Sequence, residues 1–462
     1  MDRVGVLIVS KCLSGAAMVD AISRGGYSPE FYVVEKQANP YLMARAKAHC
    51  VVPDLDIAEI SRFARRHSAR IDFGLTDTED FVTEGGRDAL EKDAGVHMLC
   101  VSKERAVEGS KADQRLLFER IFPGANPAHG VFTPRIRGGT AGALTAFRKL
   151  LKEIPEPVLK PDAPARGAGV GVWGNDFTTV ESAEAFFLNL LSKGRVVVEQ
   201  KVEGEESSFH AFSDGRHFVP APLTRDYKRS LDGNRGRLTG GMGSYRSPGD
   251  RLPFLVEEDW DQLVMAEEAA FRRWRGRGSD PGLRGIVLYD AIMHTGRGFK
   301  VLERNSRGGN TEIINLLTTM ADDFVEVCFK MLDGTLKGIR FKAASSVVTC
   351  SVPLFYGVSG AQEVRDAEVD MSRAEALRGT TQGSLRLYPM DVRLESGRLL
   401  LGSSRSIAVV GVSGTMAGAR RASLEGCRAL RGPLRWRIDV ASPADIRASR
   451  DHLRLLRSRT KG

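Results

Sequence analysis

Three observations predict a multidomain α/β protein. The chain has 462 residues, enough for roughly two to four domains. Hydrophobic residues make up 42% and charged residues 27%, the usage of a globular protein with a sizeable core. Residues 3–101 alternate apolar runs with amphipathic stretches, as strands joined by helices do in a parallel sheet. The 49 glycines predict many tight turns or phosphate-binding loops.

The N-terminal region contains the clearest alternation. Its predicted strands cover residues 4–9, 31–34, 71–75 and 96–101, and its predicted helices lie near 14–24, 56–67 and 84–92. Ligands bind to such sheets beyond the carboxyl ends of the strands. The loop after the first strand reads SKCLSG, which lacks the GxGxxG pattern and disfavours a dinucleotide site.

The pattern changes between about residues 103 and 342. We predict helices at 141–154 and 322–332, short strands at 157–160, 170–173, 196–199, 207–212 and 218–223, and a hairpin of strands 286–293 and 299–302 across Gly296 and Gly298. Residues from about 345 to 440 are rich in short strands. They predict a small mixed α/β unit.

Several classes of protein are excluded. The apolar run at residues 5–9 is too short for a signal peptide, and no apolar stretch approaches the about 18 residues of a membrane span. The six cysteines are scattered without a CxxC pair, which argues against a disulfide scaffold or a zinc ribbon. Reduced thiols in a cytoplasmic protein fit best.

The net charge of +9 lies in two peripheral segments. Residues 447–462 carry six basic residues and one acidic residue, and arginines at 272, 273, 275 and 277 account for the rest. Neither segment overlaps the two segments described next, which could bind a nucleotide. Solvated helix ends are the favoured interpretation of both segments.

Two segments of the middle region could bind a nucleotide. Lys160 ends a short strand and precedes a loop of small residues at 161–169, whose backbone N–H groups could bind phosphate. A glycine hairpin with a surface lysine is the alternative, because the loop lacks the P-loop pattern. Residues 196–207 (VVVEQKVEGEES) could offer backbone groups and carboxylates to adenine and ribose, or form a solvated acidic turn.

Two further segments could bind substrates and a metal ion. Residues 225–229 (RDYKR) lead into a glycine-rich run at 239–245 (TGGMGSY), which could close over an anionic substrate or be a loop without function. Glu303 and Asn305 lie two apart on a predicted strand, so both face one side and could bind Mg²⁺. Arg307 could hold a carboxylate or phosphate; a structural salt-bridge cluster is the alternative.

In this order the segments resemble the glycinamide ribonucleotide synthetase family of the ATP-grasp superfamily. The resemblance covers nearly the whole chain and is strongest over residues 196–245, with supporting matches at 108–111 (EGSK), 285–289 and 303–307 and a looser match at 346–412. It implies an ATP-grasp fold of four parts. These are an N-terminal parallel α/β pre-ATP-grasp domain (1–102), an ATP-grasp domain (103–342) with an inserted lid at about 130–198, a small C-terminal mixed α/β domain (343–445) and a basic tail (446–462).

The resemblance also implies roles for individual residues. ATP would be bound by Lys111, Lys160, Gly167, Gly169, Glu199, Val202 and Glu206, with the two lysines on phosphates, Glu199 and the Val202 backbone on adenine, and Glu206 on ribose. Glu303 and Asn305 would bind Mg²⁺ or Mn²⁺. Asp226, Lys228, Arg229 and Arg307 would face the substrates.

The implied reaction is an ATP-dependent ligation. ATP would convert the carboxylate of glycine to an acyl phosphate, which the amine of 5-phosphoribosylamine attacks to give glycinamide ribonucleotide, ADP and phosphate in purine biosynthesis. Positioning and electrostatics suffice for this chemistry, so no protein nucleophile is required.

The sequence departs from the family mainly in the substrate segments. The family's GGREHAL-like loop is CLSGAAM at 12–18, its GPExPL segment is LTDTEDFV at 75–82 with only Glu79 and Asp80 retained, its RFGDPE is RGGNTE at 307–312, and the histidine of its DHKR is Tyr227. The lysine of its GKGV loop is Ala168. The ATP and metal segments are therefore better preserved than the substrate segments.

Two alternatives to glycinamide ribonucleotide synthesis remain. One is a related ATP-grasp ligase that joins a different acid or amine, as the altered substrate segments suggest. The other is a non-catalytic nucleotide- or RNA-binding protein, suggested by the two arginine-rich segments; it lacks any RNP, KH or zinc signature. We expect small-molecule substrates, no membrane, no nucleic acid, and a monomer or homodimer.

Overall fold

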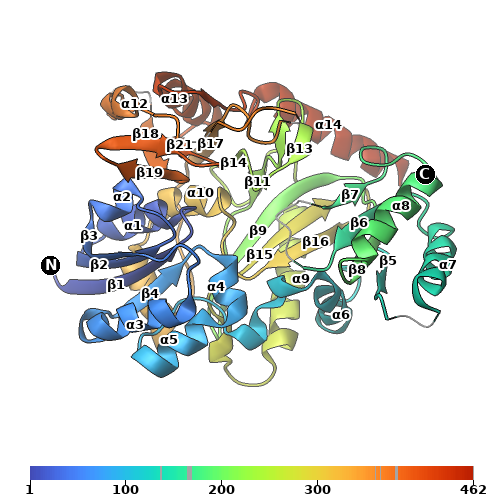
Figure 1. The fold of residues 1–462 in the computed structure, drawn as a ribbon, viewed down its shortest axis with the longest axis horizontal. Helices are drawn as coiled ribbons and strands as arrows, with labels where there is room; N and C mark the ends of the chain where they lie inside the picture. Colours follow the sequence, from blue (N-terminus) through green and yellow to red (C-terminus); the bar gives the residue numbers. More distant parts are fainter. Residues whose placement is uncertain (136–137, 164–168, 359, 365, 380–382, 461–462) are drawn as a thin grey trace.

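A parallel α/β unit at the N-terminus lies beside a long antiparallel sheet, and a smaller lobe lies at the far end of that sheet (Figure 1). The computed structural model describes residues 1–462 except 136–137, 164–168, 359, 365, 380–382 and 461–462. The mixed α/β architecture that the sequence predicts is confirmed.

Four parallel strands form the N-terminal sheet in the order β3-β2-β1-β4. They are β1 (Arg3–Ser10), β2 (Ser28–Glu35), β3 (Ala46–Val51) and β4 (Phe73–Thr76), and the helices of this unit are α1 (Gly15–Ser23), α2 (Pro40–Met43), α3 (Ile57–His67), α4 (Glu79–Glu84) and α5 (Gly86–Ala94). Strand β3 lies at the edge of the sheet, and none of its side chains is buried. It therefore has no apolar run that would predict a strand.

The strand predicted at residues 96–101 is wrong. This segment makes only an isolated bridge, between Met98 and Gly74 of β4. A Cβ atom at Gly74 would lie 2.2 Å from the sulfur of Met98, so the Met98 side chain packs directly against the backbone of β4. Val96, Met98 and Val101 are almost fully buried, which explains the apolar run without a strand.

The central sheet runs in the order β16-β15-β9-β11-β14-β17-β21-β18, and all neighbouring pairs are antiparallel. Its strands are β9 (Glu205–Asp214), β11 (Thr224–Asp226), β14 (Gly243–Arg246), β15 (Arg284–His294), β16 (Phe299–Asn305), β17 (Ser345–Pro353), β18 (Ser384–Pro389) and β21 (Ile407–Ser413). The hairpin predicted across Gly296 and Gly298 is confirmed as β15–β16.

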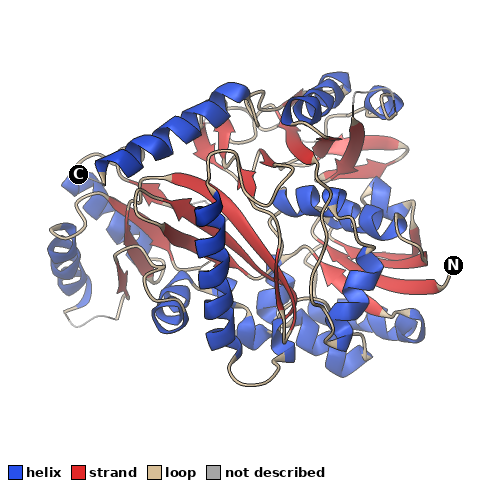
Figure 2. Cartoon of the chain, turned by 180° about the vertical axis from the view of Figure 1, so that it is seen from behind, coloured by secondary structure: helices blue, strands red, loops and turns tan. Residues whose placement is uncertain are grey.

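Shorter strands and the remaining helices surround this sheet. Strand β10 (Phe218–Pro220) pairs with β9, β22 (Leu434–Arg435) pairs with β17, and two hairpins are β12 (Arg229–Leu231) with β13 (Arg235–Leu238) and β19 (Val392–Glu395) with β20 (Arg398–Leu401). The helices are α6 (Lys111–Ile121), α9 (Glu257–Arg275), α10 (Glu312–Thr319), α11 (Phe324–Asp333), α12 (Ser372–Ala376), α13 (Met416–Ala429) and α14 (Pro443–Arg459). Figure 2 shows α9 and α14 on the back of the central sheet.

The central sheet continues across residue 343, the boundary predicted for the C-terminal domain. Strand β14, which precedes the boundary, pairs with β17, which follows it. A Cβ atom at Gly243 would lie 2.5 Å from the carbonyl oxygen of Val348, so this pairing depends on glycine in β14. The regions before and after residue 343 thus share one sheet.

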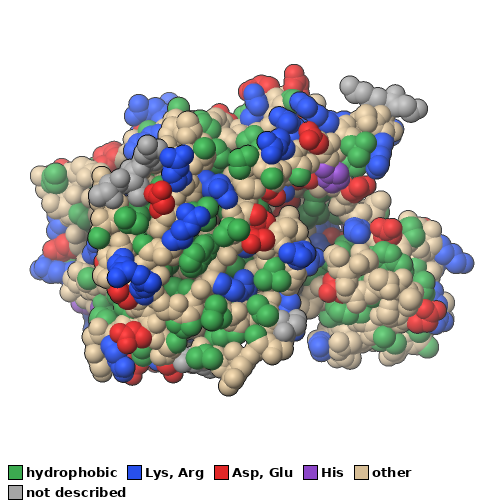
Figure 3. Space-filling view, turned by 90° about the horizontal axis from the view of Figure 1, so that it is seen from above, with side chains coloured by type: hydrophobic (Ala, Val, Ile, Leu, Met, Phe, Trp, Pro, Cys, Tyr) green, Lys and Arg blue, Asp and Glu red, His purple; other side chains and the backbone are tan. Residues whose placement is uncertain are grey.

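The lobe has a sheet and a core of its own. Its antiparallel strands are ordered β5-β8-β6-β7, with β5 (His129–Phe132), β6 (Pro157–Pro161), β7 (Gly171–Val172) and β8 (Val196–Gln200), and its helices are α7 (Gly139–Leu151) and α8 (Val180–Leu191). The stacked rings of Phe147 and Phe187, 4.3 Å apart, join the two helices. In the space-filling view a hollow separates the lobe from the body (Figure 3).

No helix in the described part of the chain is both long and apolar enough to cross a membrane. All six cysteines are free thiols, and five of them are buried.

Candidate active site

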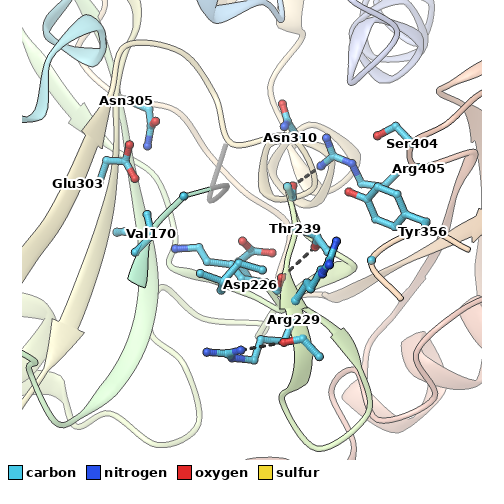
Figure 4. A pocket seen from close by; sticks show the side chains of 18 of the residues that line it. Val170, Asp226, Arg229, Thr239, Glu303, Asn305, Asn310, Tyr356, Ser404 and Arg405 are labelled. Carbon is cyan, nitrogen blue, oxygen red and sulfur yellow. Dashed lines mark hydrogen bonds between the residues drawn. The ribbon is translucent and has the colours of Figure 1, made fainter. Parts of the chain in front are cut away.

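One cavity of about 1890 Å³ brings the predicted site residues together. It lies between the lobe, the central sheet, the N-terminal α/β unit and the C-terminal region after residue 343 (Figure 4). The predicted residues that line it are Lys111, Lys160, Gly169, Glu199, Val202, Glu206, Asp226, Lys228, Arg229, Glu303, Asn305 and Arg307. Gly167, the remaining predicted residue, lies outside the described residues.

Two lysines enter the cavity from different elements. Lys111 is the first residue of α6, and its Nζ lies 3.2 Å from Oε1 of Glu303. Lys160 lies on β6 in the lobe, where its Nζ is 2.6 Å from Oε2 of Glu199 and donates to the carbonyl of Leu302 at 3.2 Å. Burial lowers the pKa of Lys160, and the negative charge of Glu199 opposes this effect.

Glu199 is the centre of a buried ion cluster. Its Oε1 accepts a hydrogen bond from Nε of Arg115 at 2.6 Å, and its Oε2 pairs with Lys160. Burial opposes ionisation, but Arg115 and Lys160 together lower the pKa of Glu199 to about 2. Both carboxylate oxygens therefore have a cationic partner, and the side chain holds Lys160 in place.

Sequence reasoning missed Arg115. This arginine is 1% exposed and also donates to Oδ1 of Asn126 at 3.1 Å and to the carbonyl of Val301 at 3.0 Å. It thus joins the lysine of the lobe to the strand that carries Glu303. The signal that could have found it is its spacing of four residues from Lys111, which places both on one face of α6.

Glu303 and Asn305 point into the cavity from the end of β16, as their period-two spacing predicts (Figure 4). Burial opposes ionisation of Glu303, but Lys111, Lys160 and Lys228 lower its pKa. Asn305 donates its Nδ2 to the carbonyl of Tyr289 at 3.3 Å, so its amide oxygen is the atom that could bind a cation.

This pair suits a hard divalent cation. Among the described residues no group of three or more His, Cys, Asp or Glu side chains could hold a metal ion. A carboxylate and an amide oxygen are enough for Mg²⁺, which takes its other ligands from phosphates and water.

A second group of charged side chains comes from the start of β9, the end of β11 and the residues after β11. Lys228 forms an ion pair with Glu206, and both line the cavity. Within the described residues no hydrogen-bond partner meets the buried Oδ1 of Asp226. Burial and the nearby Glu312 raise the pKa of Asp226 well above its ordinary value, and Lys228 opposes them.

Arg307 is held by acidic residues from two other elements. It lies 3.2 Å from Oε1 of Glu108 and 4.0 Å from Oε2 of Glu79 in α4. The backbone N–H of Ser306 donates to the other oxygen of Glu108 at 3.0 Å. Burial disfavours the charge on Arg307, but Glu108 and Glu79 raise its pKa. Glu108 was thus missed as a site residue, although it begins the EGSK match.

The glycine-rich loop and Arg229 lie on the opposite wall. Arg229 donates to the carbonyl of Gly236 at 2.8 Å within the β12–β13 hairpin. Arg405, from the C-terminal unit, donates to the carbonyl of Gly240, and so connects the loop to that unit (Figure 4).

The altered first loop is closed by a carboxylate of the chain itself. Oδ2 of Asp77 accepts hydrogen bonds from the backbone N–H groups of Leu13, Ser14 and Gly15, at 3.2, 2.8 and 2.9 Å. These N–H groups lie at the start of α1 and have no partner within the helix. Without Asp77 they could bind an anion.

The chain is similar to known ligases over its whole length. A protein named phosphoribosylamine–glycine ligase from Methanocella arvoryzae is 30% identical over 98% of this chain and 99% of its own length. One of the same name from Pyrococcus abyssi is 31% identical over 93% of both chains. The chain belongs to the phosphoribosylamine–glycine ligase family. It is therefore an ATP-dependent ligase that forms C–N bonds.

Further matches support the fold of this family member. Residues 135–313 match the family described as Phosphoribosylglycinamide synthetase, ATP-grasp (A) domain. The crystal structure of phosphoribosylamine–glycine ligase from Thermotoga maritima superposes with a TM-score of 0.72, at 23% identity, over 95% of this chain and 100% of that one. A biotin carboxylase domain from Hydrogenobacter thermophilus, solved with MgADP, superposes with a TM-score of 0.67 at 13% identity over 93% and 91% of the two chains. The predicted ATP-grasp fold is confirmed.

Proposed function

We propose that the chain joins glycine to 5-phosphoribosylamine with the hydrolysis of ATP, which yields glycinamide ribonucleotide, ADP and phosphate in purine biosynthesis. The observation that carries the proposal is the convergence, in one cavity, of two lysines, a carboxylate–amide pair and a second group of cations and acids. The names of the relatives support this choice of acid and amine. The free cysteines support a cytoplasmic location.

ATP binds between the lobe and the central sheet. Lys111 and Lys160 hold its phosphates, together with the backbone at Gly169 and, by resemblance, Gly167. The linker after β8 holds adenine through the backbone of Val202, and Glu206 holds the ribose. Glu199 contributes to the same site by keeping Lys160 in position, as its distance of 2.6 Å supports.

Mg²⁺ or Mn²⁺ would be held by Glu303 and Asn305, whose ionised carboxylate and amide oxygen suit it. When bound, the ion neutralises charge that develops on the phosphates. Lys111, 3.2 Å from Glu303, keeps that carboxylate oriented toward the phosphates.

The remaining residues act on the substrates. Arg307 binds the glycine carboxylate, which attacks the γ-phosphorus of ATP to form an acyl phosphate while ADP leaves. Asp226, buried beside Glu312, takes a cationic amine as its counterion. Lys228 and Arg229 face the anionic groups of the substrates. Before the attack this ammonium gives one proton to Asp226, which leaves a lone pair on the nitrogen. The uncharged amine then attacks the carbonyl carbon, the bond to phosphate breaks, and the nitrogen releases its second proton to the departing phosphate as the amide forms.

The test is ADP release in the presence of Mg²⁺, glycine and phosphoribosylamine formed from ribose 5-phosphate and ammonia. We expect turnover only when both the acid and the amine are present. A complete lack of ADP formation with both substrates would refute the proposal.

A related ligase with a different acid or amine is the second candidate. It is favoured by Asp77, which occupies the backbone N–H groups of the first loop, and by Asn310 at a position where the family has an acid. A screen of amino acids and amines for ADP release separates the two candidates. Strict dependence on phosphoribosylamine would eliminate the second.

A further inference from the structure

The C-terminal helix α14 packs behind the strands that line the cavity (Figures 1 and 2). Side chains alternate between the two faces of a strand. Along β11, Asp226 lines the cavity, whereas its neighbours Arg225 and Tyr227 contact α14. At the start of β9, Glu206 lines the cavity and the preceding residue contacts α14. The basic tail therefore forms a second layer behind the site.

Two residues of the first turns of α14 hold the strand β11. The hydroxyl of Tyr227 donates to Oδ2 of Asp445 at 2.6 Å, and it accepts a hydrogen bond from a backbone N–H just before the helix. Arg225 is 8% exposed and donates to the hydroxyl of Ser449 at 2.8 Å. Asp226 lies between these two anchored neighbours.

His452, one turn farther along the same helix face, holds the nucleotide linker. Its Nδ1 donates to Oε1 of Glu205 at 2.7 Å, and its Nε2 lies 3.5 Å from Oε1 of Glu203. The other oxygen of Glu205 accepts from Arg225 at 2.8 Å. Glu203 and Glu205 thus tie residues 202–206, the end of the linker and the start of β9, to α14.

We propose that α14 is a positioning element for nucleotide binding, in which His452 fixes the linker that holds adenine and ribose. This inference rests on the proposed function, since it takes Val202 and Glu206 as the nucleoside contacts. His452 does not line the cavity and acts through Glu205.

The contact depends on the charge of His452. The charged groups that face it are Glu203 and Glu205 from the linker and, on the far side of Glu205, Arg225 from β11. The hydrogen bond to Glu205 raises the pKa of His452 above its ordinary value. As the pH rises through this pKa, the imidazolium loses its charge and the contact weakens. Nucleotide should therefore bind less tightly at high pH.

The experiment measures the equilibrium affinity of the full chain for AMP and for MgATP by calorimetry between pH 6 and pH 9. The variants are His452→Gln, the charge-retaining His452→Lys, and Arg454→Gln, a control on the exposed side of the same helix. We expect His452→Gln to weaken the binding of AMP and of MgATP by the same factor at pH 6, about fivefold. The difference in affinity between His452→Gln and Arg454→Gln should shrink as the pH rises, because the nucleotide phosphates titrate alike in both variants. His452→Lys should retain the affinity at every pH.

A second comparison separates the linker from the phosphate contacts. Lys160→Ala should weaken the binding of MgATP far more than the binding of AMP. Ser449→Ala, which removes one hydroxyl, should weaken the binding of both nucleotides by the same factor. Equal affinities for His452→Gln and Arg454→Gln at every pH, with unchanged melting temperatures, would overturn the inference. If His452→Gln does not fold, unchanged affinities in Ser449→Ala would overturn it instead.

These affinity measurements need neither the acid nor the amine substrate. A wild-type chain that binds ATP but releases no ADP with glycine and phosphoribosylamine refutes the proposed function. The affinity comparison still decides the role of α14 in that case.

Discussion

At the scale of single residues, the site is built from buried charges that hold one another. Arg115, Glu199 and Lys160 form one chain of ion pairs that is almost fully buried. In a second pair, between Lys111 and Glu303, the Glu303 side chain is 35% exposed. Breaking a buried pair by removing one partner costs more than the pair contributes, because a charge is left without compensation. A substitution in the chain of Arg115, Glu199 and Lys160 should therefore lower stability as well as activity, whereas solvent around Glu303 reduces the cost of removing its charge.

The first prediction concerns the metal ligand. Glu303→Gln removes the ionised oxygen but keeps the shape, so we expect turnover to fall about 100-fold or more while the melting temperature changes little. Steady-state rates over a Mg²⁺ titration measure the effect. The matched control is Glu395→Gln in the β19–β20 hairpin, a side chain that is 58% exposed and lies outside the cavity. Near-normal turnover in Glu303→Gln would contradict the metal assignment.

The second prediction concerns a buried carboxylate behind β16. Arg304 pairs with Asp290 and Glu267 at 2.6 and 2.7 Å, and all three side chains are inaccessible to solvent. Burial, together with the charge of Asp290, raises the pKa of Glu267 well above 4.5, because one arginine cannot neutralise two carboxylates. The folded state therefore binds a proton that the unfolded state releases, and the free energy of unfolding falls as the pH rises above about 4.5.

Glu267→Gln replaces the protonated acid by a neutral side chain of the same shape. We expect the variant to gain stability relative to the wild type between pH 5 and pH 8. Urea unfolding at several pH values measures this difference. A difference that stays constant with pH would show that Glu267 does not carry the proton.

At the scale of elements, the pairing of β14 with β17 joins the catalytic region to the C-terminal region. It brings two backbones close at Gly243, where a Cβ atom would meet the carbonyl oxygen of Val348 at 2.5 Å. Backbone cannot move aside as a flexible side chain can. The strand that follows the glycine-rich loop therefore depends on this one residue.

Gly243→Ala should lower the free energy of unfolding by about 2 kcal/mol, the usual cost of overpacking. Gly249→Ala is the control, because a Cβ atom there meets nothing within 4 Å, and we expect it to change stability by less than about 0.5 kcal/mol. Chemical denaturation of both variants makes the comparison. Equal stabilities would mean that β14 can shift in its pairing without cost.

At the scale of the whole molecule, the cavity is lined by every part of the chain except the C-terminal tail. Its walls come from the lobe, the central sheet, the first loop and the C-terminal unit. A ligand bound there contacts regions that are far apart in sequence and stabilises them together. Nucleotide binding should thus be visible as a change in global stability.

MgATP at 100 times its dissociation constant should raise the free energy of unfolding by about 2.7 kcal/mol. At the same concentration Lys160→Ala should lose most of this gain, because a phosphate contact is removed. Thermal unfolding with and without MgATP measures both values. An equal gain in the variant would count against Lys160 as a phosphate ligand.

Much of the fold and of the site could be predicted from sequence. Strands β1 and β2, the β15–β16 hairpin and the helix near α11 have strong apolar patterns, and Glu303 and Asn305 share a face because of their spacing. The edge strand β3 could not be predicted, because its side chains are partly exposed. The apolar pattern at residues 96–101 predicts a strand, but the same pattern also marks a buried segment that makes a single bridge.

The sequence by itself determined the α/β class, the ATP-grasp resemblance and twelve of the residues that line the cavity. These depend on periodicity and on short motifs, which are local properties of the chain. Only the tertiary structure decided that Glu199 is the counterion of Lys160, that Asp77 closes the first loop, and that α14 lies behind the site. His452 and Glu205 are 247 residues apart, and no local pattern encodes a contact between residues that only folding brings together.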